Sequence, residues 1–347
     1  MKAIIDKYFF VQFIIFVHLL LKGKISIKKI YNVFFSYLSY IIKSTKSGKS
    51  PFMINFELWN ECNEACLFCR TGDGKIYNYD NPELTIAKGK LDIEVYKKII
   101  DQTSPYLVMS VPYINGEPLL SKDIYEAVSY ANEKKIGTLI ASNGIILNEK
   151  NINKLIDCGL DFIKIHISGM TNEIHKIEHT KGDVDKILNN ISNLVKICNE
   201  RKYKMLIMLD WISYKHNNHQ LLHAKKFAKN LNILFNIRAG NPKGLEDTEK
   251  QQYNPLNLPL KERCIWLWSI LTVDWDGSLY PCCDHVVFGL AEAYEIVKNK
   301  DKLDQESIIS IWNGLKVQNM RKIHIKKGRA PIPICAQCPR SGIGFKF

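Results

Sequence analysis

Cys62-Asn63-Glu64-Ala65-Cys66-Leu67-Phe68-Cys69 is the stretch around which this chain is organised. The three thiols follow residues 52–58, a run that mixes apolar and polar side chains over the length of one strand, so the cysteines fall in the loop after that strand. Three thiolates on one short loop suit a soft metal centre. A cluster of four irons needs four ligands, so three cysteines leave one iron open to a second molecule.

The C-x3-C-x2-C spacing of Cys62, Cys66 and Cys69 resembles the signature of the radical S-adenosylmethionine (SAM) enzymes. The resemblance implies a 4Fe–4S cluster whose open iron binds SAM, and it implies that Phe68 lines the adenine. In that family an electron from the cluster cleaves SAM, and the resulting 5′-deoxyadenosyl radical abstracts hydrogen from a substrate. The alternative is a zinc site, although zinc usually takes four ligands in paired C-x2-C knuckles.

Length and cysteine usage limit the class of protein. The 347 residues suffice for about two domains, and an apolar share of 46 % is enough for a sizeable core. Eight of the ten cysteines form groups of three, one, two and two along the chain, which favours metal ligation in a reducing compartment over a disulfide scaffold. Cys158 and Cys198 stand alone in helical patterns, and we expect them to be buried apolar side chains.

The basic character of the chain is concentrated in residues 1–50. The net charge is +13, and nine lysines with one aspartate give +8 in these fifty positions, so we expect no nucleic-acid groove on the main body. Residues 8–21 are a 14-residue apolar run, too short to span a bilayer. The following apolar positions share one helical stripe: Ile30, Val33, Phe34, Tyr37, Leu38, Ile41 and Ile42.

Three interpretations of residues 1–50 stay open. A basic, aromatic and amphipathic helical segment is typical of contact with an anionic membrane surface, here through residues 1–45. The segment could instead be a helical pair packed against the main domain or a partner. A secretory signal is the third alternative, although no small-residue cleavage site follows the apolar run.

Strand and helix patterns alternate from residue 52 to about 238. The expected strands are residues 52–58, 106–111, 137–142, 161–167, 203–211 and 233–238. The expected helices are residues 92–103, 122–135, 149–158, 184–200 and 218–231. Such alternation predicts an α/β fold with a parallel sheet, and the resembled family implies a partial, TIM-like (β/α)6 barrel over residues 51–245. Chemistry in such barrels collects in the loops after the strands.

Three of these loops resemble SAM-binding segments of the family. Asn115-Gly116-Glu117-Pro118 resembles its Gly-Gly-Glu-Pro motif, with Asn in place of the first Gly, and implies contacts of Asn115, Gly116 and Glu117 with the amino group of SAM. The same resemblance assigns cofactor contacts to Ser142, Asn143 and Ser168. Arg238 ends the sixth expected strand, and we expect it to reach a carboxylate of the cofactor at the barrel mouth. Each loop also has an ordinary interpretation as a turn before a helix.

Several histidines offer weaker signals. His166 alternates with Ile165 and Ile167 along a strand, so it would point into the barrel interior. His175 and His179, four residues apart, are not assigned a carboxylate or a third ligand, so we expect them on the surface. His216, His219 and His223 lie within eight residues, and a polar loop is favoured over a metal site there.

The C-terminal part, residues 246–347, holds a second set of cysteines. Asp276-Gly277 between two apolar runs predicts a β-hairpin. Cys264, Cys282, Cys335 and Cys338 supply four thiolates, a complete set for one further cluster, and Cys283 is left over. The pattern resembles the SPASM and twitch auxiliary-cluster domains, in the one-cluster form, and implies a second 4Fe–4S cluster. A four-cysteine zinc site is the alternative.

Together these features predict an oxidoreductase-type radical SAM enzyme that acts without oxygen on a small-molecule or sugar substrate, by dehydrogenation or epimerisation. A ribosomal-peptide maturase is an alternative, and a non-catalytic iron–sulfur carrier or redox sensor is an alternative of another class. The expected location is cytoplasmic, at the inner face of the membrane, and the expected electron donor is a flavodoxin or ferredoxin. Substrate, catalytic acid or base and oligomeric state do not follow from the sequence.

Overall fold

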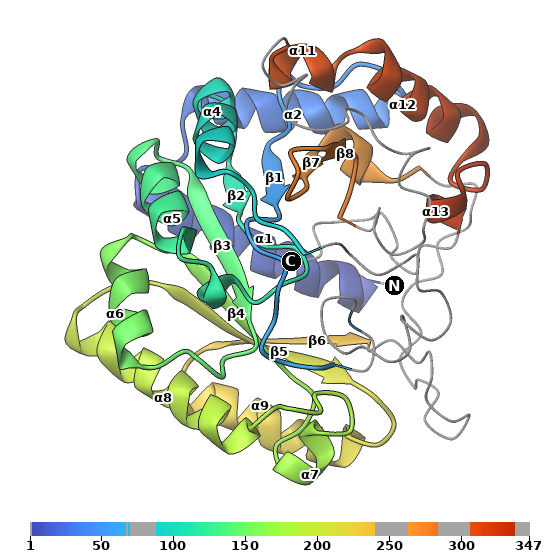
Figure 1. Cartoon of the computed structure of the whole chain (residues 1–347). Coiled ribbons are helices and arrows are strands. Elements are labelled where there is room, and N and C mark those ends of the chain that lie inside the picture. The colour runs from blue at the N-terminus through green and yellow to red at the C-terminus, as the bar shows by residue number, and fades with distance from the viewer. Residues whose placement is uncertain (1, 67–68, 70–87, 240–262, 284–305, 337–347) are drawn as a thin grey trace.

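A computed structural model describes residues 2–66, 69, 88–239, 263–283 and 306–336 (Figure 1). Phe68 and Cys338, two of the predicted ligand-binding residues, lie outside these ranges. The predicted domain boundary at residues 245–246 also lies outside them.

An open, mixed sheet of eight strands forms the centre of the molecule, in the order β6-β5-β4-β3-β2-β1-β7-β8. Its first six strands are parallel and pair in chain order: β1 (Met53–Phe56), β2 (Met109–Val111), β3 (Gly137–Ser142), β4 (Phe162–Ile167), β5 (Leu206–Ser213) and β6 (Leu234–Ala239). Each lies within its predicted range or shifts by up to three residues, so the partial (β/α)6 barrel is confirmed. The sheet does not close, because β6 and β8 form its two edges.

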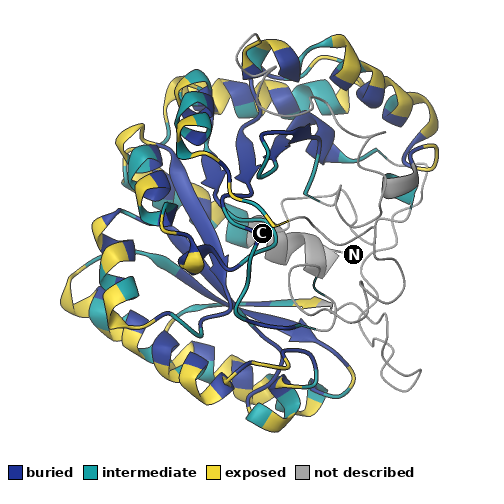
Figure 2. Ribbon diagram, in the orientation of Figure 1, coloured by how far each residue is buried: buried dark blue, intermediate teal, exposed yellow. Residues whose placement is uncertain are grey.

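Helices connect the parallel strands, as the alternating pattern predicts. They are α4 (Ile93–Thr103), α5 (Ile124–Glu133), α6 (Glu149–Asp157), α8 (Val184–Glu200) and α9 (Leu221–Asn230). Asp92, Asn148 and Asp183 begin three of them, since each side chain accepts a hydrogen bond from a backbone N–H in the first turn. These helices pack their apolar faces on the outer side of the sheet and expose their polar faces (Figure 2).

Further helical segments occur in the described part of the chain, and among them residues 218–220 alone fall within a predicted helix. They are η2 (Pro118–Leu120), α7 (Asn172–His175), η3 (Asn218–Gln220), η5 (Ile265–Trp268), α11 (Ile308–Trp312), α12 (Leu315–Lys327) and α13 (Pro333–Ala336). The range predicted as one helix from 218 to 231 is therefore η3 followed by α9. Three to five residues are too few for an apolar period to show in the sequence, and most of these segments have that length.

The predicted hairpin is present, and it extends the sheet of the barrel. Strand β7 (Ile270–Val273) pairs parallel to β1, with Met53 opposite Ile270, and β8 (Leu279–Tyr280) returns antiparallel to β7. Gly277 adopts a φ of +83°, which favours glycine in the turn between them. Apolar residues of the hairpin and of α11 and α12 join the same core as the outer face of the barrel.

The N-terminal helices α1 (Lys2–Leu21) and α2 (Ile27–Ile41) cover the amino-terminal end of the strands. Ile15 and Leu19 of α1 are buried in an apolar cluster with residues near the strand starts: Met53, Met109, Leu139, Phe162, Met208 and Ile270. A methyl group on Gly137, the first residue of β3, would lie 2.7 Å from a Leu19 side-chain carbon. The pair is thus packed on the main body, one of the three interpretations left open by the sequence.

Ionic contacts hold the turn between α1 and α2 in place. Asp161, fully buried before β4, accepts hydrogen bonds from Lys22 Nζ at 3.0 Å and Lys24 Nζ at 2.5 Å. The backbone N–H and the hydroxyl of Thr138 donate to the same carboxylate at 2.9 and 3.2 Å. Two lysines that the sequence assigns to a basic surface therefore serve as internal partners of a buried acid.

The apolar residues predicted to share one stripe lie on two sides of α2. Val33 and Tyr37 pack toward the core, whereas Ile30, Phe34, Ile41 and Ile42 are exposed. No helix in the described part of the chain is both long and apolar enough to cross a membrane.

Candidate functional site

The cysteine loop begins at the carboxyl end of β1, where a parallel sheet collects its functional loops. Cys62, Cys66 and Cys69 are partly exposed. The loop turns back tightly, because Cys69 N donates to Cys66 O at 3.2 Å. A β-bridge between Cys66 and His179 joins it to the segment that follows β4.

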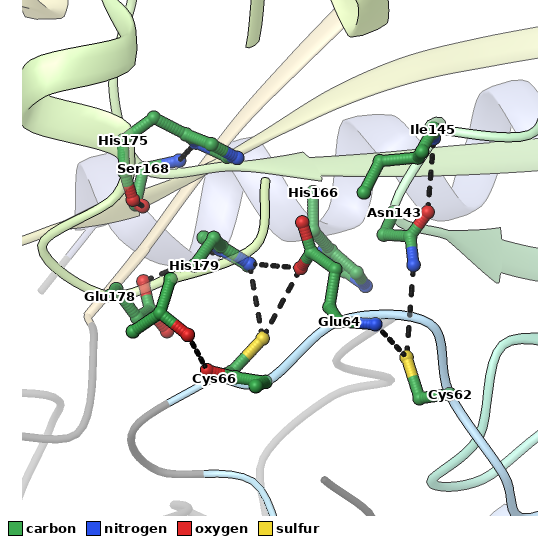
Figure 3. A network of polar contacts seen from close by, with 12 residues as sticks. Cys62, Glu64, Cys66, Asn143, Ile145, His166, Ser168, His175, Glu178 and His179 are labelled. Carbon is green, nitrogen blue, oxygen red and sulfur yellow. Dashed lines mark hydrogen bonds and ion pairs between the residues drawn. The ribbon is translucent and has the colours of Figure 1, made fainter. Parts of the chain in front are cut away.

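Cys62 lies against the loop that follows β3. Asn143 Nδ2 donates to Cys62 Sγ at 3.7 Å and to Asn63 Oδ1 at 2.8 Å, and Glu64 N donates to the same sulfur at 3.4 Å (Figure 3). Burial raises the pKa of the Cys62 thiol to about 12. Without a metal ion this thiol stays protonated at neutral pH, and a metal ion would have to displace the proton.

Cys66 lies beside a buried acid–histidine pair. Its sulfur is 3.1 Å from His179 Nδ1 and 3.2 Å from Glu64 Oε2, and the nitrogen and that oxygen are 2.6 Å apart (Figure 3). Burial alone would lower the pKa of His179, but the charges of Glu64 and Glu178 raise it to about 9. His179 is therefore an imidazolium at neutral pH, paired with the Glu64 carboxylate.

The prediction that His175 and His179 lie on the surface is wrong. Both are buried, and their rings stack with centroids 4.5 Å apart. Burial lowers the pKa of His175 to about 3, so it stays neutral beside the charged His179. His179 has two carboxylate partners: the adjacent Glu178, 3.5 Å from Nε2, and Glu64, which is 115 residues away in the sequence. A methyl group on Gly182 would lie 2.7 Å from the His175 ring and 2.8 Å from Glu64 Oε1.

Glu117 joins the loops after β2 and β3. Its carboxylate accepts hydrogen bonds from Ser142 Oγ and from Asn143 N, both at 2.8 Å. Its backbone N–H donates to Glu61 O at 2.9 Å, just before the first cysteine. Burial raises the pKa of Glu117 to about 7. Three residues predicted from separate motifs are thus in direct contact.

Asn115, which replaces the first glycine of the motif, has its own acceptor. The fully buried Glu57 accepts hydrogen bonds from Asn115 N at 2.9 Å and from Asn115 Nδ2 at 2.6 Å. Burial raises the pKa of Glu57 to about 8 in spite of these bonds. Gly116 lies directly against the backbone, since a methyl group there would be 2.3 Å from Trp59 O. The sequence offers no local signal for Glu57, because its partner is nearly sixty residues away.

Ser168 and Arg238, the other two predicted contacts, have different surroundings. Ser168 is buried, with its hydroxyl donating to His175 O at 3.4 Å. Arg238 Nε donates to Asp210 Oδ2 at 2.8 Å, and His166 Nδ1 lies 2.8 Å from the same oxygen. This group on β4, β5 and β6 centres on the buried Asp210, which the sequence reasoning missed. Burial and the Arg238 charge lower the pKa of His166 to about 4.

Three cysteines on one loop fit an iron–sulfur cluster with an open iron, because thiolates are the ligands that such clusters use. A second donor set overlaps with it: Glu64, Cys66 and His179 have ligand atoms within 4.8 Å of one another. Among the described residues this is the one such group, so His216, His219 and His223 do not assemble a metal site there. Cys158 and Cys198 are buried, as predicted.

The second set of cysteines lies at the other end of the sheet. Cys264 precedes η5 and β7, and Cys282 follows β8. An antiparallel hairpin returns to the end from which it started, and both thiols pack on the apolar cluster at the strand starts. Cys264 N donates to the buried His324 Nδ1 at 3.2 Å. Cys335 lies in α13.

Comparison with known families agrees with both cysteine sets. The profile of the radical SAM superfamily matches residues 56–211, which hold the first loop and strands β2 to β4. Residues 56–211 are therefore a radical SAM domain. The profile of the SPASM iron–sulfur cluster-binding domain matches residues 264–339, so a radical SAM domain is followed by a C-terminal SPASM domain. The expected cofactors, iron–sulfur clusters and SAM, are those of these two domains.

Individual relatives are distant. Fe-coproporphyrin III synthase of Methanosarcina barkeri is 26 % identical over 48 % of this chain and 38 % of its own length. Mycofactocin maturase MftC of Mycobacterium tuberculosis is 27 % identical over 42 % of this chain and 34 % of its own length. The matched region thus spans well under two thirds of these curated relatives.

Two solved structures share the fold. BtrN, crystallised with AdoMet (SAM) and 2-DOIA, superposes with a TM-score of 0.53 at 17 % identity over 85 % of this chain and 97 % of BtrN. SuiB of Streptococcus suis, bound to SAM, gives a TM-score of 0.62 at 10 % identity over 80 % of this chain and 69 % of SuiB. At these identities the likeness concerns the fold.

Proposed function

We propose that Cys62, Cys66 and Cys69 hold a 4Fe–4S cluster, and that the enzyme uses SAM to oxidise or epimerise a small-molecule or sugar substrate. When bound, the cluster and SAM supply a 5′-deoxyadenosyl radical that abstracts hydrogen. The observation that carries the proposal is the convergence of four loops: those after β1, β2, β3 and β4 meet through side-chain contacts around Cys62 and Cys66.

The chain's own residues have distinct tasks in this proposal. Asn115, Gly116 and Glu117 line the amino group of SAM, and the bonds of Glu57 to Asn115 hold their loop in position. Ser142, Asn143 and Ser168 contribute on the loops after β3 and β4, with Arg238 on β6 and Phe68 at the adenine. The pair Glu64–His179 orients the Cys66 side of the loop, since charged hydrogen-bond partners fix the orientation of metal ligands.

For the SPASM domain we propose one auxiliary 4Fe–4S cluster held by Cys264, Cys282, Cys335 and Cys338. The hairpin supports this assignment, because it returns Cys282 to the end of the sheet where Cys264 lies. Such a cluster would accept or relay an electron from the substrate, giving a net two-electron oxidation. The predicted domain limits, 51–245 and 246–347, belong to the same proposal.

A second candidate function is maturation of a ribosomal peptide. It is favoured by the relatives, since MftC is a maturase and SuiB has been crystallised with its precursor peptide SuiA. The radical step would be the same, and the substrate would be a peptide that reaches the carboxyl end of the barrel.

The proposal also includes the location of the enzyme, its electron donor and its membrane contact. A reducing cytoplasm keeps the cysteines from forming disulfides, so that they remain available as cluster ligands, and a flavodoxin or ferredoxin supplies the electron. Contact of residues 1–45 with the inner face of the membrane would bring the barrel near lipid-linked substrates.

Anaerobic reconstitution of the full chain with iron and sulfide tests the chemistry. With SAM and dithionite we expect 5′-deoxyadenosine, together with an absorbance band that bleaches on reduction. The variant Cys62→Ser should form none, while Cys158→Ser, at the buried C-cap of α6, should match the wild type. Wild-type protein that contains zinc, or that binds iron yet never yields 5′-deoxyadenosine, would overturn the proposal.

The substrate class is decided by a second assay. Deuterium transfer into 5′-deoxyadenosine from labelled sugars or amino alcohols supports the first candidate. Deuterium transfer from a labelled precursor peptide, with no transfer from the small molecules, would instead support maturation of a ribosomal peptide.

A further inference from the structure

Helix α2 turns its apolar face to solvent. Seven apolar side chains on this face are between 47 % and 71 % exposed: Ile27, Ile30, Tyr31, Phe34, Phe35, Ile41 and Ile42. Their spacing follows the helical period, so they form one continuous strip, called here the exposed α2 face. In Figure 2 exposed and buried positions alternate along α2. An apolar strip of this length on a surface indicates a site of interaction.

Polar side chains on the inner side fix this orientation. Lys29 Nζ donates to Lys24 O at 3.0 Å and to Lys135 O at 2.5 Å. Asn32 Nδ2 donates to Ser50 O at 2.9 Å, and Ser50 N donates to Asn32 Oδ1 at 3.3 Å. Lys29, Asn32 and Ser50 are buried. A roll of α2 that hid the apolar strip would break all of these buried bonds, which is costly.

The segment after α2 prevents such a roll as well. A methyl group on Gly48 would lie 2.5 Å from both Asn32 Oδ1 and Ser36 Oγ, so the chain packs directly on the polar side of α2. Trp268 Nε1 donates to Ser44 O at 2.8 Å, and Ser47 Oγ donates to Trp268 O at 2.7 Å. The strip is therefore held outward by contacts with the SPASM domain and the barrel.

The charges around the strip are positive. Lys28 and Lys43 are exposed at its two ends, and Lys46 and Lys49 are exposed just beyond. Asp6 is the one acidic residue among the first fifty. Lysines beside an interfacial helix can extend their ammonium groups to lipid phosphates while apolar side chains enter the acyl region.

We propose that the exposed α2 face docks the enzyme on an anionic lipid bilayer, with the helix lying in the plane of the interface. This inference rests on the membrane contact of residues 1–45 in the proposed function, and it is independent of the proposed radical reaction. A second copy fits this face less well, because antiparallel pairing of two α2 helices would bring Lys28 of each copy beside Lys43 of the other. The spacing of aromatic and basic side chains is that of an interfacial helix.

Vesicle flotation of the full-length protein tests this inference. We expect the protein to float with vesicles of phosphatidylcholine and phosphatidylglycerol and to bind pure phosphatidylcholine at least about tenfold more weakly. The double variant Phe34→Ser/Phe35→Ser should lose binding by about tenfold or more, because two aromatic anchors are removed. The control Leu222→Ser, at a side chain 76 % exposed on α9, should bind as the wild type does.

Charge variants and solution size complete the test. Lys28→Gln and Lys43→Gln should each weaken binding to anionic vesicles roughly fivefold and reduce its salt dependence. Wild-type protein that stays unbound at low salt would overturn the inference. So would a wild-type dimer that Phe34→Ser/Phe35→Ser converts to a monomer, since a second copy would then cover the face. The variants should unfold at the same temperature as the wild type, which excludes misfolding as the cause of weaker binding. Formation of 5′-deoxyadenosine is measured without vesicles, so that a failure of the proposed radical reaction is distinguished from a failure of membrane binding.

Discussion

The two ends of the central sheet are built on different principles. At the carboxyl end, loops after four strands are joined mainly by polar side chains, with Glu57, Glu117 and the Glu64–His179 pair as acceptors and partners. At the amino end, α1 and α2 cover the strand starts with apolar side chains. One buried acid, Asp161, accepts hydrogen bonds from Lys22 and Lys24 of the turn between these helices. The polar side chains at the carboxyl end are therefore available for chemistry, whereas the side chains at the amino end stabilise the fold.

Each end also carries cysteines. The loop of Cys62, Cys66 and Cys69 begins at the carboxyl end, whereas Cys264 and Cys282 pack on the cluster at the amino end. Strand β7 runs parallel to β1. The loop that follows β1 and the segment that precedes β7 therefore lie at opposite ends of these two strands, and each carries one set of cysteines. If both sets bind clusters, one end would bind SAM and the other would serve electron transfer.

The largest expected effect separates the two cysteine sets. Cys66→Ala should abolish 5′-deoxyadenosine formation, since two thiolates cannot hold the SAM-binding cluster. Cys264→Ala should lower the iron content by about half and leave cleavage of SAM without substrate largely intact. Iron analysis and product assays on both variants, with Cys198→Ala as the control, measure the contrast. Equal loss of SAM cleavage in both would mean that the two ends do not work separately.

The next effect concerns stability at the amino end. Asp161→Asn leaves Lys24 buried without its carboxylate, which we expect to cost about 3–5 kcal/mol of unfolding free energy. The control Asp157→Asn removes an exposed contact with Arg201 and should cost no more than about 1 kcal/mol. Denaturant unfolding of the two variants gives the values. A loss as small as that of the control would show that the buried ion cluster is not what anchors α1 and α2.

Titration of Glu57 gives the carboxyl end a pH dependence. Burial raises its pKa from 4.5 to about 8, so between these values the folded state binds a proton that the unfolded state has released. Stability should therefore be highest below about pH 4.5 for this group and fall as the pH rises toward 8, by roughly 1.4 kcal/mol for each unit of the shift. Other groups titrate in the same range, so the contribution of Glu57 is the difference between variants.

Unfolding experiments on metal-free protein at pH 5.5 and pH 8.5 isolate that difference. Glu57→Gln should show a smaller decrease between the two pH values than the wild type. Glu94→Gln, at an exposed helix position, should leave the decrease unchanged. A wild-type slope in Glu57→Gln would mean that Glu57 is ionised throughout.

The smallest effect is expected from Asn115→Gly, which restores the residue of the family motif. It removes the hydrogen bond from Asn115 Nδ2 to Glu57 and should cost about 1 kcal/mol of stability. SAM affinity, measured by equilibrium binding to the reconstituted protein, should change by no more than about fivefold, because Asn115 N keeps its bond to Glu57. A loss of a hundredfold would show that the Asn115 side chain contacts SAM itself.

By itself the sequence predicted the strands, the connecting helices, the hairpin at Asp276-Gly277 and the cysteine loop. Apolar periodicity and turn residues act over a few positions, so they are visible in the local sequence. The motifs of Glu117 and Ser142–Asn143 were also visible, and the structure brings them into contact.

Only the tertiary structure decided which distant side chains meet. Glu64 and His179, Asp161 and Lys24, and Glu57 and Asn115 are between 58 and 137 residues apart, and no local pattern pairs them. The outward face of α2 belongs to the same group: periodicity predicted an apolar strip, and buried bonds of Lys29 and Asn32 decided that much of it faces solvent. A buried polar group must find a partner wherever the fold brings one, and that choice depends on the assembled core.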